Sequence, residues 1–472
     1  MTQTPIPRTC IVIGAGIGGL SIAALMSKAG YAVTILEKND RVGGRAMTYV
    51  RDGFTFDMGP SWVHMPEVYE SLFARCGKNF REYVHLVALN PQYRMFFEHD
   101  EPLDVSAKLE DTLALLEKRY PGSAEPIRAF LDIGRKQYDM SLKHILYTPL
   151  ERLSDLRSLD LTSIGKNARI WPSLAGLVAH YTKNPSLQKL LTYTALFVGG
   201  DPAKLPALYA LLSYLDLACG VQYPVGGVGA LIDGIKRLAA ESGAVIHYDA
   251  EVTKLDVVNG RIERVHTAHA TYSADVVIAN ADLPHVETKL LDKQYQTYGA
   301  GYWKSKTIAP SAFVMYIGLN RKLSQALHHM IYIPDDWRSH LDALHASSTH
   351  WPDNPIMYIS CPSRTDSTVA PRDQDQLFVT IQLPLAVDDT LANREKYAAL
   401  TIKRIEMMVG ESLRDAILFT EIRALTDYTT MFNAYRGTAI GLATTTLQSM
   451  FRPHHHSSKV HNLFYTSQYT MP

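Results

Sequence analysis

Strand-like and helix-like patterns alternate at the start of the chain. Residues 9–13 are almost wholly apolar, as in a strand buried on both faces. A glycine-rich turn follows, and small and apolar residues then recur at helical spacing up to Gly30, a residue type that suits the end of a helix. Residues 32–36 form a second apolar run that ends at Glu37. We therefore predict strand, turn, helix and strand in this order.

The pattern changes twice further along the chain. Between about residues 106 and 217 leucines recur at helical spacing, which predicts a mostly helical region. From residue 244 short apolar runs predict strands, two of which are joined as a hairpin by the turn Asn259-Gly260. Strands and helices then mix over residues 307–422. Without internal repeats or low-complexity linkers, the domains are expected to be interleaved in sequence.

Charge and cysteine content exclude several classes of protein. The 472 residues carry 47 basic and 47 acidic side chains, and no run of basic residues points to nucleic acid as a partner. The four cysteines are far apart and form no metal or disulfide motif. The chain begins without a signal-peptide pattern and has no apolar stretch of about 18 residues. We predict a cytoplasmic protein whose membrane contact, if any, is peripheral.

The glycine-rich turn after the first strand has the spacing of a dinucleotide-binding motif. Gly14 suits the tight turn, Gly16 lets the backbone approach a pyrophosphate, and Gly19 allows close packing of helix on strand. Ile17 and Gly18 open the helix, whose free N–H groups favour phosphate. A glycine triplet alone is weak evidence, but strand, helix and second strand are all present. We predict that these five residues bind a dinucleotide.

A carboxylate and a second glycine turn refine this prediction. Glu37 lies where an acidic residue binds the ribose hydroxyls, which favours FAD or NAD over NADP. Lys38 follows it, and Gly43, Gly44 and Arg45 then form a turn for which an NAD enzyme has no use. The two glycines would let the backbone pass close to a cofactor, and the guanidinium could meet pyrophosphate oxygens. These residues favour FAD.

Further motifs extend the likeness over essentially the whole chain. It resembles the bacterial phytoene desaturases, with the diapophytoene desaturases close beside them, among the FAD-dependent flavoproteins of the amine oxidase superfamily. The motifs that carry the resemblance are Phe54 to Pro60 followed by Met65 to Tyr69, Phe197 to Pro202, Tyr223 to Leu231, Asn280 to Asp282, Met315 to Gly318 and Phe451 to Pro453. Several of them separate desaturases from amine oxidases.

The resemblance implies a fold and additional cofactor contacts. The expected fold is α/β, with a Rossmann-type FAD-binding domain interleaved with a mixed-sheet substrate domain and a helical insert. Met58, Gly59 and Pro60 should lie under the flavin ring, and Glu251 with Val252 at the adenosine end, although Val252 could equally be an ordinary buried strand residue. The implied ranges are 1–75, 222–295 and 430–472 for the FAD-binding domain, 76–95 and 296–429 for the substrate domain, and 96–221 for the insert.

The resemblance also implies an activity. Such an enzyme desaturates phytoene, a colourless isoprenoid polyene of carotenoid biosynthesis, by hydride transfer to FAD while a proton leaves the neighbouring carbon. Asp155 aligns with an acid proposed to take that proton in the family, and Arg157 is a weak companion. The alternative for Asp155 is a solvated loop residue or a helix N-cap.

Expected partners follow from such a substrate. A C30 or C40 hydrocarbon must be drawn from a bilayer, so a monotopic membrane contact is expected, with Ile170 to Pro172 and Leu174 to Val178 as one location. Those residues could also be plain core. Residues 226–229 lack the spacing of a second dinucleotide motif, so a reductase or monooxygenase fed by NADPH is disfavoured. The electron acceptor should be oxygen or a quinone.

Other functions stay open at this point. A C30 diapophytoene desaturase, a carotenoid isomerase or oxidase, and an amine-oxidase-like flavoprotein are alternatives among enzymes. A different class is a non-catalytic relative of the same fold that binds prenyl groups without FAD. The consecutive His454, His455 and His456 cannot all point at one ion from regular structure, so no metal is predicted.

The end of the sequence departs from the family pattern. Relatives continue past the final Thr-x-Pro with a glycine-rich turn and a last helix, whereas this sequence stops at Pro472, and Ser467 replaces a common glycine. Either the chain continues beyond this residue or it binds FAD poorly.

Overall fold

A parallel sheet carries the first glycine turn. The computed structural model describes residues 8–144, 173–345, 348–445, 448, 449 and 451–471. The 5-stranded sheet has the order β19-β13-β1-β2-β9. Its strands are β1 (Thr9–Ile13), β2 (Ala32–Leu36), β9 (Val245–His247), β13 (Val276–Ala279) and β19 (Leu463–Tyr465), and all neighbours pair in parallel. The carboxyl ends of these strands therefore meet at one edge of the sheet, the edge at which open α/β sheets bind ligands.

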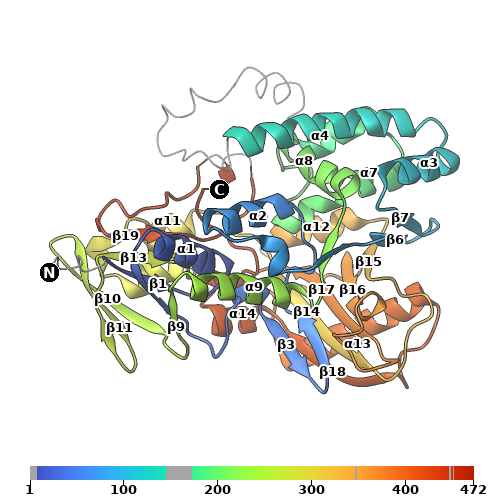
Figure 1. The fold of residues 1–472 in the computed structure, drawn as a ribbon. Coiled ribbons are helices and arrows are strands. Elements are labelled where there is room, and N and C mark those ends of the chain that lie inside the picture. The colour runs from blue at the N-terminus through green and yellow to red at the C-terminus, as the bar shows by residue number, and fades with distance from the viewer. Residues whose placement is uncertain (1–7, 145–172, 346–347, 446–447, 450, 472) are drawn as a thin grey trace.

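Helices pack on this sheet and a small antiparallel sheet lies beside it. Helix α1 (Ile17–Lys28) connects β1 to β2 and contacts α9 (Val228–Glu241), and α2 (Pro66–Arg75) lies nearby (Figure 1). Strands β10 (Val252–Val258), β11 (Arg261–Thr267) and β12 (Thr271–Tyr272) form a 3-stranded sheet. Asn259 and Gly260 have positive φ values of 50° and 73°, as the predicted hairpin turn requires.

A mixed sheet forms the other half of the molecule. This 7-stranded sheet has the order β18-β14-β17-β16-β15-β6-β7, and every pair is antiparallel except β15 with β6. All nine residues of β14 are buried, since it lies between two neighbours and is covered on both faces. The strands are β6 (Tyr93–Phe97), β7 (Leu103–Val105), β14 (Ser311–Leu319), β15 (His329–Ile333), β16 (Met357–Ser360), β17 (Gln376–Leu383) and β18 (Ile417–Arg423).

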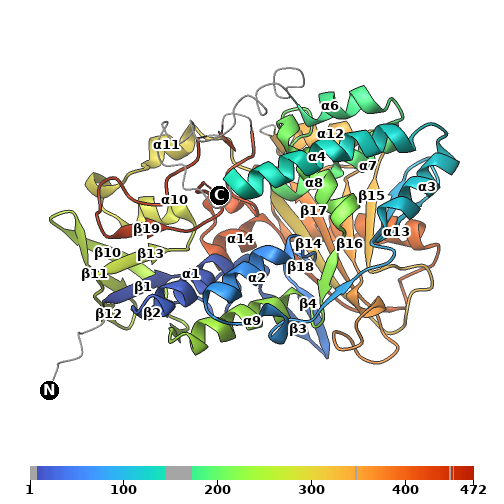
Figure 2. The same ribbon diagram turned by 45° about the horizontal axis from the view of Figure 1, so that its top comes forward.

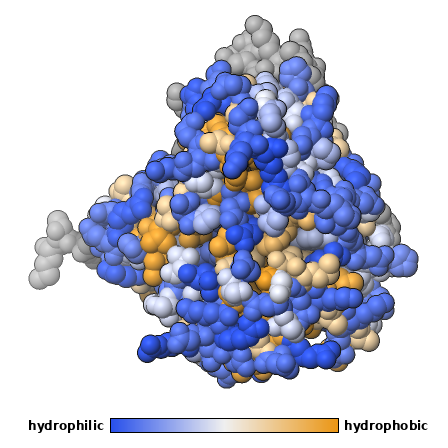
Figure 3. Space-filling model, turned by 90° about the vertical axis from the view of Figure 1, so that its right-hand side faces the viewer, coloured by the Kyte–Doolittle hydropathy of each residue, from blue (hydrophilic) through white to orange (hydrophobic). Residues whose placement is uncertain are grey.

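Helices cover the mixed sheet, as Figure 2 shows. The helices of this half of the molecule are α3 (Leu109–Arg119), α4 (Ala124–His144), α6 (Leu174–Tyr181), α7 (Pro185–Thr192), α8 (Ala210–Tyr214), α12 (Trp337–His345), α13 (Leu391–Val409) and α14 (Leu425–Phe432). Among the described residues, no helix is both long and apolar enough to cross a bilayer. Hydrophobic residues on the face shown in Figure 3 appear as patches in a mainly hydrophilic surface.

Short elements complete the fold. The two-stranded pairs are β3 (Thr48–Arg51) with β4 (Phe54–Asp57) and β5 (Leu86–Ala88) with β8 (Gln222–Pro224). Brief helices are α10 (Leu283–His285) and α11 (Ala300–Lys304), and brief 3-10 or π turns are η1 (Gly44–Ala46), η2 (Phe80–Glu82), η4 (Tyr193–Val198), η5 (Ala207–Tyr209), η6 (Leu215–Cys219), η7 (Val286–Leu290), η8 (Lys293–Tyr295), η9 (Pro362–Arg364) and η10 (Tyr435–Gly437).

The architecture confirms the predicted α/β class, a Rossmann-type sheet beside a mixed sheet with a helical region. One predicted boundary needs correction. Residues 96–221 were expected to be a helical insert, but β6 ends at Phe97 and β7 pairs with it, so both belong to the mixed sheet. The partner that holds β6 in this sheet is β15, more than 200 residues away, and local periodicity carries no sign of that pairing.

Candidate cofactor and substrate site

The first glycine turn is shaped by contacts that exclude side chains. Gly14 has a φ of 97°, which favours glycine, and a Cβ at Gly19 would lie 2.0 Å from the Gly14 carbonyl oxygen. Helix α1 begins directly after Gly16, which makes no side-chain cap. The first N–H groups of the helix therefore have no intrahelical acceptor and suit an anionic ligand.

The second glycine turn packs against the first. Gly43 and Gly44 have φ values of 114° and 56°. The N–H of Gly43 donates to the carbonyl of Ala15 at 2.9 Å, and Gly16 and Gly43 form an isolated parallel bridge. Two turns separated by a helix and a strand in sequence thus form one continuous backbone surface.

Glu37 lies at the end of β2 with its carboxylate almost entirely buried. One oxygen accepts from the N–H of Ala15 at 2.7 Å, and the other accepts from the N–H and the side-chain amide of Asn39, both at 2.9 Å. A carboxylate offers about four acceptor positions. Three are used here, so capacity remains for a hydroxyl of a ligand.

A polar group closes the far end of this region. The Lys38 ammonium donates to Asn433 Oδ1 at 2.8 Å and lies 3.3 Å from Glu251 Oε1. Asn433 in turn donates its amide to Glu251 at 3.0 Å. Val252, which follows Glu251 in the sequence, is buried and begins β10. These contacts bring Lys38 beside Glu251, which precedes Val252; the last two residues are those expected at the adenosine end.

These features line a cavity of about 530 Å³, which we call the nucleotide cavity. It follows the carboxyl edge of the parallel sheet. Of the predicted cofactor residues, those on its wall are Gly14, Gly16, Ile17, Gly18, Glu37, Lys38, Gly43, Gly44, Arg45, Pro60 and Val252. Gly19 lies behind the wall, where it lets α1 approach the turn, and Met58 and Gly59 line a neighbouring cavity instead.

Sequence reasoning left several wall residues out of the predicted site. Asn280 follows β13 and donates its amide to the Gly14 carbonyl at 3.3 Å, and Thr466 follows β19. Both line the nucleotide cavity, as do Ser467 and Met471. Asn280 begins one of the motifs named above, but its place beside Gly14 depends on strand order. Only the pairing of β13 with β1 brings the two residues together.

Arg45 and Asp282 meet where the nucleotide cavity ends. A guanidinium nitrogen of Arg45 lies 3.5 Å from a carboxylate oxygen of Asp282, which also accepts from the Tyr469 hydroxyl at 2.9 Å. Burial raises the pKa of Asp282 to about 6, although Arg45 and Tyr469 act in the opposite direction. The Nε atom of Arg45 is buried without a hydrogen-bond partner. A buried donor of this kind suits an acceptor atom of a ligand.

The residues of the nucleotide cavity fit a dinucleotide with a flavin. The residues around this space supply a helix N-terminus, two glycine turns, a buried carboxylate with spare acceptor capacity and an arginine with an unpaired N–H. They are the groups that pyrophosphate, ribose and ring acceptors need.

A second cavity of about 410 Å³, the apolar cavity, adjoins the first. Arg45 and Pro60 line both, so a ligand in one is next to a ligand in the other. Its walls come from segment 58–64, from η4, and from the mixed sheet, with apolar and aromatic side chains predominating. They include Met58, Trp62, Leu196, Phe197, Val314, Ile331, Met357, Tyr358 and Phe378.

A small polar network lies in the wall of the apolar cavity. The indole N–H of Trp62 donates to the Tyr358 hydroxyl at 2.6 Å, and this hydroxyl bonds to His329 Nδ1 at 2.8 Å. The ring of Trp62 stacks on that of His329 with centroids 4.8 Å apart. Burial lowers the pKa of His329 well below its usual value, so its ring is neutral. The Tyr358 hydroxyl accepts from Trp62, so its own hydrogen is available for Nδ1 of His329.

A buried carboxyl lies behind this wall. Tyr193 lines the apolar cavity and donates its hydroxyl to Asp216 at 2.8 Å, and Tyr93 donates to the same carboxyl at 2.6 Å. Burial raises the pKa of Asp216 to about 7, and the two tyrosine hydroxyls reduce this rise.

Two sequence predictions concern residues 145–172. Asp155, the predicted proton acceptor, and Arg157 lie outside the described residues, as do Ile170 to Pro172. Of the adjoining stretch, Leu174, Leu177 and Val178 on α6 are buried in the hydrophobic core, and α6 contacts α4 and α7. These three side chains therefore belong to the core, which is the alternative that the sequence left open.

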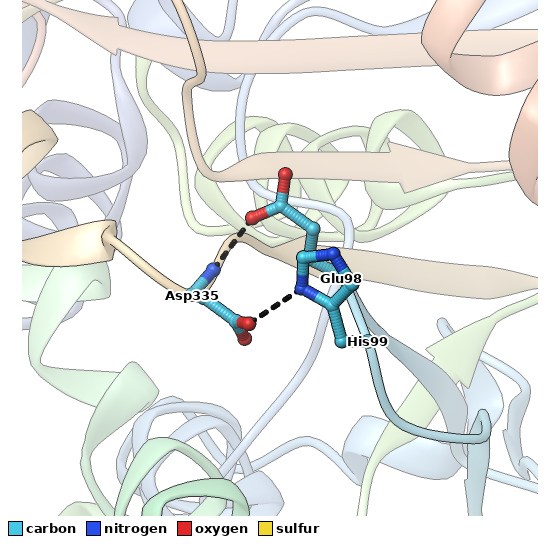
Figure 4. Close-up of side chains that lie close together, drawn as sticks. All are labelled: Glu98, His99 and Asp335. Carbon is cyan, nitrogen blue, oxygen red and sulfur yellow. Dashed lines mark hydrogen bonds and ion pairs between the residues drawn. The ribbon is translucent and has the colours of Figure 1, made fainter.

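Two further groups of residues contain histidines. Glu98, His99 and Asp335 lie together at the surface (Figure 4). Their atoms are engaged with one another, and the Lys189 ammonium lies 2.9 Å from Asp335, which disfavours a cation. Of the consecutive histidines, His455 lines the nucleotide cavity.

Comparison with known proteins adds independent information. The sequence pattern of the family described as flavin containing amine oxidoreductase matches residues 17–472. A carotenoid 3,4-desaturase of Haloarcula japonica is 38% identical over 98% of this chain and 93% of its own. A zeta-carotene-forming phytoene desaturase of Myxococcus xanthus is 32% identical over 98% and 90%. The crystal structure of an oxidoreductase from Methanosarcina mazei superposes with a TM-score of 0.65 over 98% and 95% at 16% identity, which supports the fold alone.

Proposed function

The chain belongs to the flavin-containing amine oxidoreductases, and within them to the carotenoid desaturases, and on this premise we propose that it desaturates a C40 polyene of the phytoene type. It is an FAD-dependent oxidoreductase that acts on CH–CH units. The observation that supports a polyene substrate is the contact between the two cavities. Arg45 and Pro60 line both the polar nucleotide cavity and the apolar cavity.

The chain's own residues account for cofactor binding. When bound, FAD supplies the chemistry that accepts a hydride from a C–H bond. The α1 N-terminus and the backbone of Gly43 and Gly44 would hold the pyrophosphate, Glu37 a ribose, and Arg45 an acceptor atom at the junction. Segment 58–64 and the mixed sheet would keep the substrate beside it and exclude water.

The composition of the apolar cavity favours a hydrocarbon over an amine. Among its described lining residues there is no carboxylate, and the permanently charged one, Arg45, is a cation. A cationic amine would be repelled there, whereas a polyene gains about 0.8 kcal/mol for each CH₂ transferred from water.

Two related substrates are further candidates. A C30 diapophytoene would suit the same chemistry. The relative of 38% identity is a carotenoid 3,4-desaturase, which supports desaturation near the end of an already conjugated carotenoid as the second candidate. We further propose a lipid surface as the source of the polyene and oxygen or a quinone as the final electron acceptor, since a hydrocarbon substrate and the lack of a second dinucleotide motif support both. The role of Asp155 as a proton acceptor, which the family resemblance implies, stays a prediction.

The test is turnover by the purified chain of 472 residues. We would load it with FAD and supply phytoene, diapophytoene or a carotenoid saturated at its 3,4 position in phosphatidylcholine liposomes. Loss of the oxidised-flavin absorbance without oxygen, and product spectra with oxygen or a quinone, would identify the substrate. The highest rate is expected with phytoene.

The outcomes separate the candidate functions. A higher rate with the 3,4-saturated carotenoid or with diapophytoene would replace phytoene by that substrate. Bound FAD without reduction by any polyene would contradict the desaturase proposal, and a protein that is folded but binds no FAD would favour the non-catalytic class. A Gly19→Ala variant serves as the cofactor-free control, because its added methyl group would strike the Gly14 carbonyl.

A further inference from the structure

His64 lines the apolar cavity, and one of its ring nitrogens is buried without a partner. Its Nδ1 is buried and has no hydrogen-bond partner, although the residue lines the cavity. Buried polar atoms are normally paired, so an unpaired one beside a ligand space indicates a role toward the ligand. The sequence prediction did not single out this residue.

The backbone around His64 is firmly held. Val63 and Gln222 exchange two backbone hydrogen bonds of 3.0 and 3.2 Å, and α2 begins at Pro66. Between them Met65 has a φ of 56°, a left-handed conformation that a bulky side chain rarely adopts. Such strain often accompanies functional sites, because neighbouring structure must enforce it. The backbone on both sides of His64 is thus held in place.

His64 lies on the segment that connects the two cavities. Pro60, four residues earlier, lines both, and Trp62 and His64 line the apolar cavity after it. The ring of His64 lies 5.9 Å from that of Trp62, centroid to centroid. The two rings are tilted by 52° to one another, so Trp62 packs beside the imidazole.

The state of the His64 ring suits a proton acceptor. The backbone of Gly220 accepts a hydrogen bond from the ring, and because Nδ1 has no partner, Nε2 is the nitrogen that carries the hydrogen. Nδ1 then has a free lone pair. Burial lowers the pKa of His64 to about 4, which keeps the imidazole neutral at physiological pH.

Other lining groups offer no comparable base. His340 uses both ring nitrogens, Nε2 on the Gln382 carbonyl at 2.9 Å and Nδ1 on the Ile356 N–H at 3.0 Å. The hydroxyls of Tyr193 and Tyr358 are engaged as described above, and Arg45 is cationic. Among the described lining residues, His64 is therefore the one with an unshared basic nitrogen.

We propose that His64, in place of Asp155, is the catalytic residue that accepts the substrate proton, and that it does so at Nδ1. The proposal rests on the proposed desaturase function. FAD, when bound, would supply the acceptor for a hydride that leaves one carbon, and the C–H bond of the neighbouring carbon would break. Its electron pair becomes the new C=C π bond, while its proton forms an N–H bond with the Nδ1 lone pair. A carbon acid next to an electron-deficient centre is far stronger than imidazolium, so a weakly basic imidazole suffices.

The first test is reduction of the flavin in a single turnover with phytoene in phosphatidylcholine liposomes. His64→Gln keeps the size and polarity but removes the base, and we expect a rate at least about 100-fold lower, with FAD content and phytoene affinity unchanged. His269→Gln, at an exposed site outside both cavities, is the matched control and should match the wild type. A His64→Gln rate within about 3-fold of the wild type would overturn the proposal.

Chemical rescue distinguishes the loss of a basic nitrogen from the loss of side-chain volume at position 64. Imidazole should restore flavin reduction in His64→Ala, whereas pyrazole, of the same shape but far weaker basicity, should not. Equal rescue by both would assign His64 a packing role and overturn the proposal.

A third measurement does not depend on turnover. Diethylpyrocarbonate reacts with unprotonated imidazole nitrogens, so mass spectrometry should find His64 modified and protected by phytoene, with His340 much slower. If no polyene reduces the wild-type flavin, the proposed function fails; if the wild type is active but His64 is neither modified nor protected, only the present proposal fails.

Discussion

The nucleotide cavity and the apolar cavity adjoin but are built from different parts of the chain. The nucleotide cavity is formed largely by backbone: two glycine turns, a helix N-terminus and residues that follow parallel strands. The apolar cavity is formed by side chains from η4, segment 58–64 and four strands of the mixed sheet. A backbone site dictates residue type at fixed positions, whereas an apolar wall accepts many side chains of similar volume.

The largest effect is expected from adding one methyl group to the backbone site. In Gly19→Ala the new Cβ would lie 2.0 Å from the Gly14 carbonyl oxygen, so the turn and α1 must separate. We expect the variant to lose bound FAD, which flavin absorbance measures. We also expect its free energy of unfolding to fall by at least about 3 kcal/mol, which denaturant unfolding measures. Gly301→Ala, with no atom near its Cβ, should retain FAD and stability. Normal FAD content in Gly19→Ala would contradict the conclusion that closely packed backbone forms the nucleotide cavity.

The next effect is a pH dependence of stability caused by Asp216, which lies behind the wall of the apolar cavity. Asp216 keeps its proton up to about pH 7 in the folded protein but loses it near 3.8 when unfolded. The folded state therefore binds more protons in this window, and the free energy of unfolding falls as pH rises from about 4 to about 7. A pKa shift of this size corresponds to a change of up to about 4 kcal/mol in the free energy of unfolding.

Asp216→Asn should remove this pH dependence. Denaturant unfolding at pH 5 and pH 8 should show a smaller loss of stability in the variant than in the wild type, while FAD content stays unchanged. Parallel losses in the two proteins would mean that Asp216 is ionised throughout.

A smaller effect is expected at the ribose end of the nucleotide cavity. Glu37→Gln replaces a carboxylate that accepts three hydrogen bonds with a neutral amide. Loss of charge-assisted bonds costs about 1.5–3 kcal/mol, or about 10- to 100-fold in FAD affinity, which flavin fluorescence titration measures. Glu263→Gln, on the exposed face of β11, is the control. Equal affinity in the two variants would exclude Glu37 from cofactor binding.

The smallest effect tests the polar network of the apolar cavity. Tyr358→Phe leaves the Trp62 N–H without an acceptor and His329 Nδ1 without a donor. We expect a loss of about 1–3 kcal/mol in unfolding free energy with unchanged FAD affinity. Tyr272→Phe, at a hydroxyl without a hydrogen-bond partner in the described chain, should change little. If FAD affinity falls in Tyr358→Phe, the two cavities are coupled more strongly than their geometry indicates.

The comparison also explains how much of the site could be predicted. Nearly all of the predicted nucleotide-binding residues line the nucleotide cavity. Strand, turn, helix and strand are local structures, and glycine at a positive φ or at a close approach leaves a mark in the sequence. Met58 and Gly59 were expected under the flavin and lie on the apolar cavity, because the chain turns from one cavity into the other at Pro60.

By itself the sequence determined the glycine turns, the place of Glu37 after β2, the strand and helix pattern and the flavoprotein family, because each depends on short-range spacing or on motifs. Only the tertiary structure decided that Asn280 and Thr466 join Gly14 at one sheet edge, that β6 and β7 extend the mixed sheet, and that His64 faces the apolar cavity. The physical reason is that parallel pairing and sheet order bring together residues hundreds of positions apart, and no local pattern of hydrophobic and polar residues records that pairing.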